Sequence, residues 1–295
     1  MTDSKLFTVV GIKETAKKDT AKKKIYKGFP FISVILLTAI ILACLFAEVL
    51  MTKDPSYLDL KNCSTAPNKE FIFGTDSLGR DIYSDIWYGG RISISIGFLS
   101  TLISTVIAVI YGSVSGTAPK WLDDIMMRFT EIFLSVPSIL LVIFIEAVLG
   151  QSNIPTLSFV IGITSWPSIA KVVRTEVMQI RQSEYVAASK CMGADFMHIL
   201  KNHLAPNFIS SIMFMIVMNI RSAISTESTL SFMGMGLPIE IISWGSMLSL
   251  AQKALMTESW WVILIPGTFL IALLMSITNI GNYIRKTLNQ EESNI

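Results

Sequence analysis

The chain has 295 residues, of which 52% are apolar and only 16% are charged, whereas soluble domains carry about 25% charged residues. Its net charge of +2 supplies no basic face for a nucleic acid, and its apolar residues occur in runs too long for a soluble core. A soluble enzyme, a disordered chain and a nucleic-acid-binding protein are therefore excluded. The composition predicts an all-α integral membrane protein.

Six apolar segments are long enough to cross a bilayer as helices, which takes about 20 residues because a backbone in lipid must satisfy its own hydrogen bonds. The fourth segment is short and is interrupted at Trp166-Pro167. The predicted spans are residues 29–50, 92–116, 129–149, 155–173, 208–232 and 260–283. They divide the chain into a tail at 1–28, a first span, an outer loop at 51–91, a helical core at 92–284 and a tail at 285–295.

The distribution of basic residues predicts the orientation in the membrane. Lys and Arg number 17 in the N-terminal tail, the second and fourth loops and the C-terminal tail, against six in the remaining loops. Because basic loops stay in the cytoplasm, both termini are expected there. The lysine run at 17–24 is interpreted as a topology anchor rather than a binding patch.

No combination of residues predicts catalysis, a metal site or a bound cofactor. The sequence has no G-x-x-x-x-G-K-[ST] motif, so the chain is not expected to bind ATP through a P-loop. His198 and His203 are five residues apart, a poor spacing for sharing a metal on one helix. Gly112 and Gly116 flank a valine rather than a serine, so they are interpreted as small residues at a helix contact and not as a nucleophile elbow.

Residues 174–207 form the largest predicted cytoplasmic loop, and their pattern predicts two short helices. Ser183 can cap a helix at 184–192, and Gly193 can end it in the left-handed conformation. Asp195 can cap a second helix, and Pro206 indicates where the chain re-enters the membrane.

The first of these helices carries the small residues Ala187, Ala188 and Ser189. A short helix with a small-residue face can insert into a groove on another protein. It can equally be part of an amphipathic hairpin resting on lipid headgroups. The residues themselves leave both interpretations open.

The stretch from Glu184 to Gly193, followed by His203-Leu204-Ala205-Pro206-Asn207, resembles the EAA loop of ABC-importer permeases. In that family this loop is the coupling helix that docks into the ATP-binding subunit. Ala187 stands where the family has Glu, and Ala205 stands where Leu is usual. The resemblance therefore implies a docking role for this loop, without a salt bridge from residue 187.

A second stretch, residues 73–81, precedes the second predicted span and is followed by Tyr88-Gly89-Gly90-Arg91-Ile92-Ser93. Together with residues 226–236 and Ser243-Trp244-Gly245, it resembles the C-type permeases of dipeptide and oligopeptide importers. By itself the stretch could be an ordinary solvated turn. Its residues include Gly74, Thr75, Asp76, Gly79, Arg80 and Asp81.

Two charged residues, Arg221 and Glu227, lie deep in the fifth predicted span. They are six residues apart, so helical spacing does not pair them, and each needs water, a backbone carbonyl or another helix. We expect at least one of them to line a translocation pathway. Structural packing is the alternative for both.

The resemblance implies a six-span permease with a type I ABC-importer fold in a bacterial inner membrane. It also implies the partners, which are a second homologous permease, two ABC ATPase subunits that hold ATP and Mg²⁺, and an extracytoplasmic substrate-binding protein. Di- or oligopeptides are the expected substrates, with nickel, glutathione or another small solute as alternatives. An ion-coupled secondary transporter is a more distant alternative, and it would need an internal repeat and a coupling-ion site, neither of which is evident in the sequence.

Overall fold

A computed structural model of the chain describes residues 28–150, 152–193 and 205–292. Within these ranges the regular elements are helices, apart from one isolated β-bridge between Thr75 and Asp81, so the all-α prediction is confirmed for this part of the chain. The helices are α2 (Phe31–Leu45), α3 (Ala47–Leu50), α4 (Ile82–Thr117), α5 (Lys120–Ser135), α6 (Ser138–Leu149), α7 (Ile154–Arg181), α8 (Glu184–Cys191), α10 (Ala205–Phe232), α11 (Trp244–Ser249), α12 (Ala251–Met256) and α13 (Trp261–Glu292).

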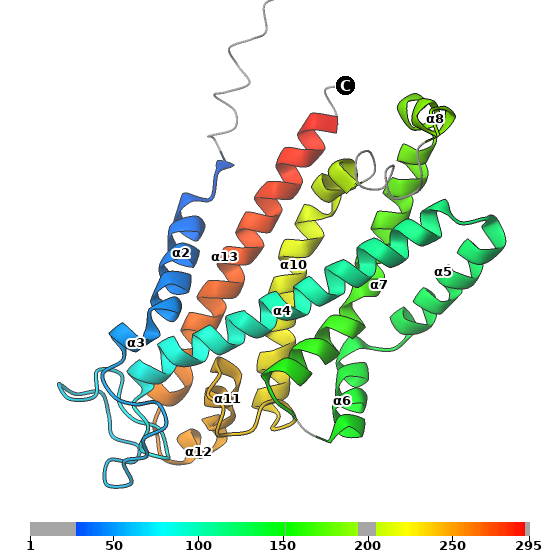
Figure 1. Ribbon diagram of the computed structural model, residues 1–295. Coiled ribbons are helices and arrows are strands. Elements are labelled where there is room, and N and C mark those ends of the chain that lie inside the picture. The colour runs from blue at the N-terminus through cyan, green and yellow to red at the C-terminus, as the bar shows by residue number, and fades with distance from the viewer. Residues whose placement is uncertain (1–27, 151, 194–204, 293–295) are drawn as a thin grey trace, which may run out of the picture.

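The long helices run between two ends of the molecule (Figure 1). One end holds α8 and the last turns of α13, and the other holds the loop of residues 51–81 together with α11 and α12. The segments expected in the cytoplasm are thus separated from those expected outside. Which end faces the cytoplasm stays a prediction.

Several helices extend beyond the apolar segments that predicted them. α4 begins at Ile82 rather than at residue 92, because the Asp81 side chain caps it by accepting a hydrogen bond from the Ser84 N–H. α7 continues past residue 173 to Arg181, and α13 continues past residue 283 to Glu292. Hydropathy locates the part of a helix that suits lipid. The backbone hydrogen bonds of the helix continue beyond that part until a capping residue or a helix-breaking residue ends them.

The third predicted span is not one continuous helix. α5 and α6 are separated by Val136 and Pro137 and meet at an angle of 89°. Pro137 has no N–H to continue the ladder, and Val136 before it takes the extended conformation at φ −100° and ψ 133°. The segment at 129–149 is therefore broken at Pro137, and whether the bent pair forms one span stays a prediction.

The fourth predicted span is continuous, although the sequence indicated an interruption at Trp166-Pro167. Pro167 lies inside α7 without breaking it. The hydroxyls of Thr164 and Ser165 donate to backbone carbonyls one turn earlier, the latter to Ile161 at 2.6 Å. Such side-chain bonds help a membrane helix to tolerate an internal proline.

Among the described residues, three helices are long and apolar enough to cross a membrane, namely α4, α7 and α13. The bent pair α5–α6 is a fourth candidate, and α2 is a shorter apolar helix of 15 residues. Membrane-spanning character is thus supported, while the count of six spans stays a prediction.

Close packing of α4 against α7 depends on the two glycines that the sequence indicated. A Cβ atom on Gly112 would lie 2.6 Å from the Ala170 carbonyl oxygen, and one on Gly116 would lie 2.8 Å from Val177. Both distances are too short for a methyl group. The interpretation of these glycines as a helix-contact motif is confirmed.

Gly112→Ala is expected to destabilise the folded protein by about 2 kcal/mol, because the added methyl group forces α4 away from α7. Thermal unfolding of the purified protein in detergent measures the effect. Gly267→Ala is the matched control, since its Cβ would meet only Leu248, at 4.0 Å. Equal loss of stability in the two variants would contradict this account of the α4–α7 contact.

Candidate functional site

A cavity of about 520 Å³ lies between the α5–α6 break, the middle of α7 and the middle of α10. Phe133, Leu141 and Met215 contribute apolar surface to it. Hydroxyl and amide side chains contribute the polar surface, from Ser138, Thr164, Ser165, Ser168, Asn219 and Ser222. A cavity with both kinds of lining near the middle of the long helices suits a polar solute that passes through a membrane.

Arg221 supplies the one formal charge among the described residues that line this cavity. Its side chain is half-buried, and its Nε is fully buried with no hydrogen-bond partner. Among the side chains that the structure describes, no carboxylate forms an ion pair with it. Arg221 therefore brings an unneutralised positive charge to the cavity.

Glu227 lies elsewhere and has a different environment. Its side chain is fully buried, and each carboxylate oxygen accepts two hydrogen bonds from serine hydroxyls. Ser93 belongs to α4, and Ser243 is the residue directly before α11. The Ser243 hydroxyl donates to Glu227 Oε1 at 2.7 Å. Glu227 thus joins three elements, with the other two bonds coming from Ser228 and Ser231 of its own helix.

These contacts separate two residues that the sequence treated alike. Arg221 borders the cavity, whereas Glu227 does not and is enclosed by this chain. The burial and the hydrogen bonds of Glu227 favour packing, the second of the two roles left open for it, while its place on a pathway stays a prediction. Helical periodicity could not indicate this, because Ser93 and Ser243 lie outside its helix.

The stretch before α4 is a buried turn rather than a solvated one. The exposed fractions of Thr75 and Asp76 are 0% and 4%. The Asp76 carboxylate accepts hydrogen bonds from the backbone N–H groups of Leu78 and Arg80, at 2.8 and 2.9 Å. Burial raises the pKa of Asp76 above its usual value, and the backbone donors oppose that shift.

The turn is attached to other segments at the same end of the molecule by several hydrogen bonds. The Arg80 guanidinium donates to the Ile239 carbonyl at 3.1 Å, and the Trp261 indole donates to the Thr75 carbonyl at 3.0 Å. Asp81 accepts from the Thr52 hydroxyl at 2.8 Å while it caps α4. The family-like residues of this stretch therefore hold the outer loop on α4 and α13.

Two glycines of the stretch have backbone conformations that other residues avoid. Gly74 has φ +76° and Gly79 has φ +78°. A Cβ on Gly74 would lie 2.6 Å from the Thr65 carbonyl, and one on Gly79 would clash with the Asp59 backbone. Glycine is required at both positions.

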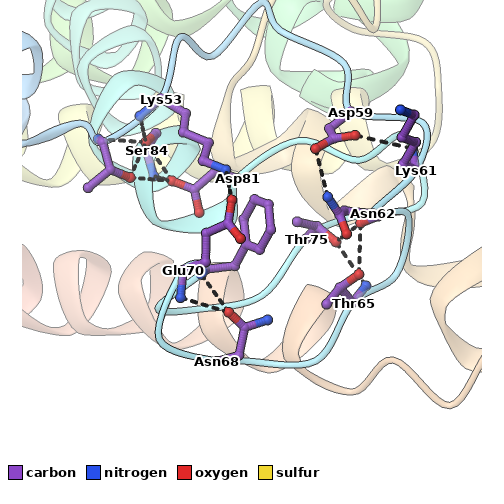
Figure 2. Close-up of polar contacts among 12 residues, drawn as sticks. Lys53, Asp59, Lys61, Asn62, Thr65, Asn68, Glu70, Thr75, Asp81 and Ser84 are labelled. Atoms are coloured by element: carbon purple, nitrogen blue, oxygen red, sulfur yellow. Dashed lines mark hydrogen bonds and ion pairs between the residues drawn. The ribbon is translucent and has the colours of Figure 1, made fainter.

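The rest of the outer loop forms two polar groups, which Figure 2 shows side by side. Lys53 pairs with Glu70 at 2.8 Å and lies 3.8 Å from the centre of the Phe71 ring. The Asn62 side chain donates to Asp59 at 2.8 Å, and this bond lowers the pKa of the Asp59 carboxyl. Both groups lie in the loop of residues 51–81, at the end of the molecule opposite α8.

The predicted coupling helix is present as α8, Glu184–Cys191, and includes Ala187, Ala188 and Ser189. Gly193 follows it with φ +85°, which is the left-handed conformation predicted for the helix end. The Ser183 hydroxyl donates back to the Ile180 carbonyl at 2.6 Å. Asp195 lies outside the described residues, and Pro206 lies in the first turn of α10.

α8 is attached to the long helices through its apolar side. Val186 is fully buried in a cluster with Val173 and Val177 of α7 and Ile212 of α10. Ser189 is 4% exposed, whereas Glu184 is exposed. A displacement of α8 is therefore expected to be passed to α7 and α10.

A further polar contact, which the sequence analysis missed, joins α4, α5 and α7. Asp123 accepts hydrogen bonds from Arg174, whose Nε lies 2.5 Å from Oδ1 and whose Nη2 bonds to Oδ2. The Ser115 hydroxyl also donates to Asp123 Oδ1, at 2.5 Å. Arg181, further along α7, donates to the Thr117 carbonyl at 3.0 Å. The signal available in the sequence was an acidic residue in the second predicted loop and an arginine directly after the fourth predicted span, but a count of loop charges does not show which charges pair.

Comparison with known proteins gives a consistent result. Residues 108–289 match a family model described as "Binding-protein-dependent transport system inner membrane component". The oligopeptide transport system permease protein OppC of Bacillus subtilis is 37% identical over 258 residues, which is 88% of this chain and 84% of that protein. The dipeptide transport system permease protein DppC of the same organism is 34% identical, over 76% of this chain and 69% of its own length.

A solved structure of the methionine ABC transporter MetNI, in an inward-facing conformation, shares the fold. Its matching chain has a TM-score of 0.56 and 19% identity, over 68% of this chain and 95% of that chain. The likeness agrees with the predicted fold, an all-α membrane protein of the type I ABC-importer kind. With the family match over 108–289 and the identity to OppC and DppC, it follows that the chain belongs to the binding-protein-dependent transport system inner membrane components, the permease family of ABC importers.

Proposed function

We propose that this chain is a permease subunit of an ATP-driven importer of di- or oligopeptides. The observation that carries the proposal is identity of 37% and 34% to relatives named as oligopeptide and dipeptide permeases, over most of the chain. The cavity with hydroxyl, amide and apolar lining supports it, because a peptide presents both backbone donors and acceptors and varied side chains. The chain itself hydrolyses nothing and binds no cofactor.

The other subunits follow from the family. A second homologous permease completes the pore, two ABC ATPase subunits hold ATP and Mg²⁺, and an extracytoplasmic binding protein delivers the solute. The binding protein contacts the segments 51–91 and 233–259. Both termini lie in the cytoplasm of a bacterial cell, and the long helices lie in its inner membrane among lipid. The excess of basic residues in the tails and in the loop 174–207 supports this orientation.

The geometry of α8 supports a coupling mechanism. The helix lies at one end of the molecule, and Val186 ties it to α7 and α10, which border the cavity near their middle. Closure of the ATPase pair moves α8, and this movement tilts the two helices. The cavity then opens alternately to the two sides of the membrane.

Gly193→Val is expected to lower ATP-driven peptide uptake about tenfold, because a β-branched residue resists φ +85° and changes the end of α8. Uptake by the reconstituted importer, together with ATPase co-purification, measures the effect. Gly193→Asn is the matched control, since Asn adopts the left-handed conformation and no neighbouring atom lies within 4 Å of a Cβ here. Equal losses in the two variants would contradict the role assigned to this backbone conformation.

The proposal as a whole is tested by deletion of residues 184–193. We expect that the deletion abolishes both ATPase co-purification and uptake. Transport by the single purified chain on an ion gradient alone, without ATPase subunits, would disprove the proposed function and favour a secondary transporter.

A further inference from the structure

Arg221 needs a counter-charge that the described part of the chain does not provide. An uncompensated cation inside a membrane protein is costly unless it meets water or an anion. The cavity that Arg221 borders has a volume of about 520 Å³, which leaves room for water and for a small solute.

Other polar groups around the cavity are neutral and can bond to either donors or acceptors. Ser165 and Ser168 line it from α7, and Ser138 lines it from the first turn of α6. The last turn of α5 and the first turn of α6 border it as well, so both carbonyl and N–H ends of interrupted helices are present. Their partial charges oppose one another, which leaves Arg221 to set the sign of the potential.

We infer that Arg221 is a transient counter-ion for a carboxylate carried by the transported solute. This inference rests on the proposed function and adds the chemical class of the group recognised in the cavity, namely the free C-terminal carboxylate of a short peptide. A guanidinium binds a carboxylate through two parallel N–H donors, and Arg221 has no carboxylate partner of its own among the described side chains.

The position of Arg221 favours a passing contact rather than tight binding. Asn219, one neighbour in the cavity lining, already donates to Ser104 of α4 at 2.6 Å, so it is not free to close around a ligand. The side chain of Arg221 is half-buried and borders an open cavity. A site of this kind lowers the cost of moving a carboxylate through the membrane without retaining it.

The first experiment compares uptake of trialanine with uptake of its C-terminal amide by the reconstituted full importer. Each peptide is supplied at a concentration that saturates the binding protein, and this concentration is determined in a separate binding measurement. Selection by the binding protein then does not affect the ratio of acid uptake to amide uptake. We expect Arg221→Gln to lower uptake of the free acid about tenfold more than uptake of the amide. Arg221→Lys keeps the positive charge and is expected to retain most of the wild-type preference for the free acid over the amide.

The outcomes separate this inference from the proposed function. If the wild-type importer takes up neither peptide in the presence of ATP, the proposed function fails. If uptake is present but Arg221→Gln lowers the acid and the amide by the same factor, the counter-ion role is wrong and the proposed function stands. That second result is expected if Arg221 instead pairs with an acidic residue of the partner permease.

A second measurement does not depend on transport and covers variants that assemble poorly. Ser168 is chosen as the labelling position because it is exposed and lines the cavity. Ser168→Cys is introduced into a chain whose native Cys44, Cys63 and Cys191 are replaced by Ser, so that residue 168 carries the thiol that is labelled. The reagents are a sulfonate and a trimethylammonium methanethiosulfonate. We expect Arg221→Gln to lower the ratio of anionic to cationic labelling rates about tenfold.

The control for this measurement is a chain that keeps only Cys63, which is exposed in the outer loop. Because Cys63 lies outside the cavity, its labelling ratio is expected to be the same whether or not the chain also carries Arg221→Gln. An unchanged ratio at residue 168 would overturn the inference.

Discussion

Glu227→Ala is expected to lower stability more than the other substitutions proposed for this chain. The change removes the acceptor of four serine hydroxyls, two on each carboxylate oxygen, in a site with no exposed surface. We expect a cost of about 3 kcal/mol or more, because buried hydroxyls that lose their acceptor keep their desolvation penalty. Thermal unfolding in detergent and the amount of protein in the membrane measure it.

The effect is expected to extend to α11. Ser93 accepts a hydrogen bond from the Trp244 N–H, and Ser243 accepts one from the Ser246 N–H while both donate to Glu227. Losing the carboxylate frees these hydroxyls to rotate, which weakens the start of α11. Protection of the α11 amides in hydrogen exchange is therefore expected to fall.

Two controls make the Glu227 prediction specific. Glu227→Gln keeps an oxygen acceptor and is expected to cost less than Glu227→Ala. Glu240→Ala removes the same side chain from an exposed position and is expected to change stability by about 0.5 kcal/mol at most. If Glu227→Ala unfolds at the same temperature as Glu240→Ala, the hydrogen-bonded carboxylate does not hold these elements together.

Asp123→Ala is expected to have the second largest effect. It leaves the Arg174 guanidinium without its partner, at a contact that joins α5 to α7 and, through Ser115, to α4. The side chains of Asp123 and Arg174 are 8% and 25% exposed, so water compensates the arginine only in part. We expect a cost of about 3 kcal/mol, measured as a lower unfolding temperature.

The neighbouring Asp124→Ala is the matched control, because Asp124 is exposed and forms no ion pair with Arg174 within the described part of the chain. A double-mutant cycle with Arg174→Ala tests the pairing directly, since contacting residues show non-additive changes. We expect the double variant to lose less stability than the two single variants added together. Additive losses would mean that the two side chains do not stabilise each other.

Much of the fold could be predicted because its signal is local. A long apolar run specifies a membrane helix whatever its neighbours are, and a small residue repeated four positions later specifies a face that another helix can approach. Gly112 and Gly116 were predicted in this way, and so was the left-handed end of α8 at Gly193. The break between α5 and α6 was missed, although Pro137 was visible, because a proline in a membrane helix is often tolerated, as Pro167 is in α7.

The sequence by itself determined that this protein is an α-helical membrane protein with a short helix between two of its predicted spans, since hydropathy and helix-ending residues are properties of neighbouring residues. Only the tertiary structure decided which groups surround each of the buried and half-buried charged side chains. Glu227 meets Ser93 across 134 residues, and Asp123 meets Arg174 across 51 residues, while Arg221 meets a cavity. A buried charge takes its role from the groups that surround it in space, and the packing of distant helices supplies those groups.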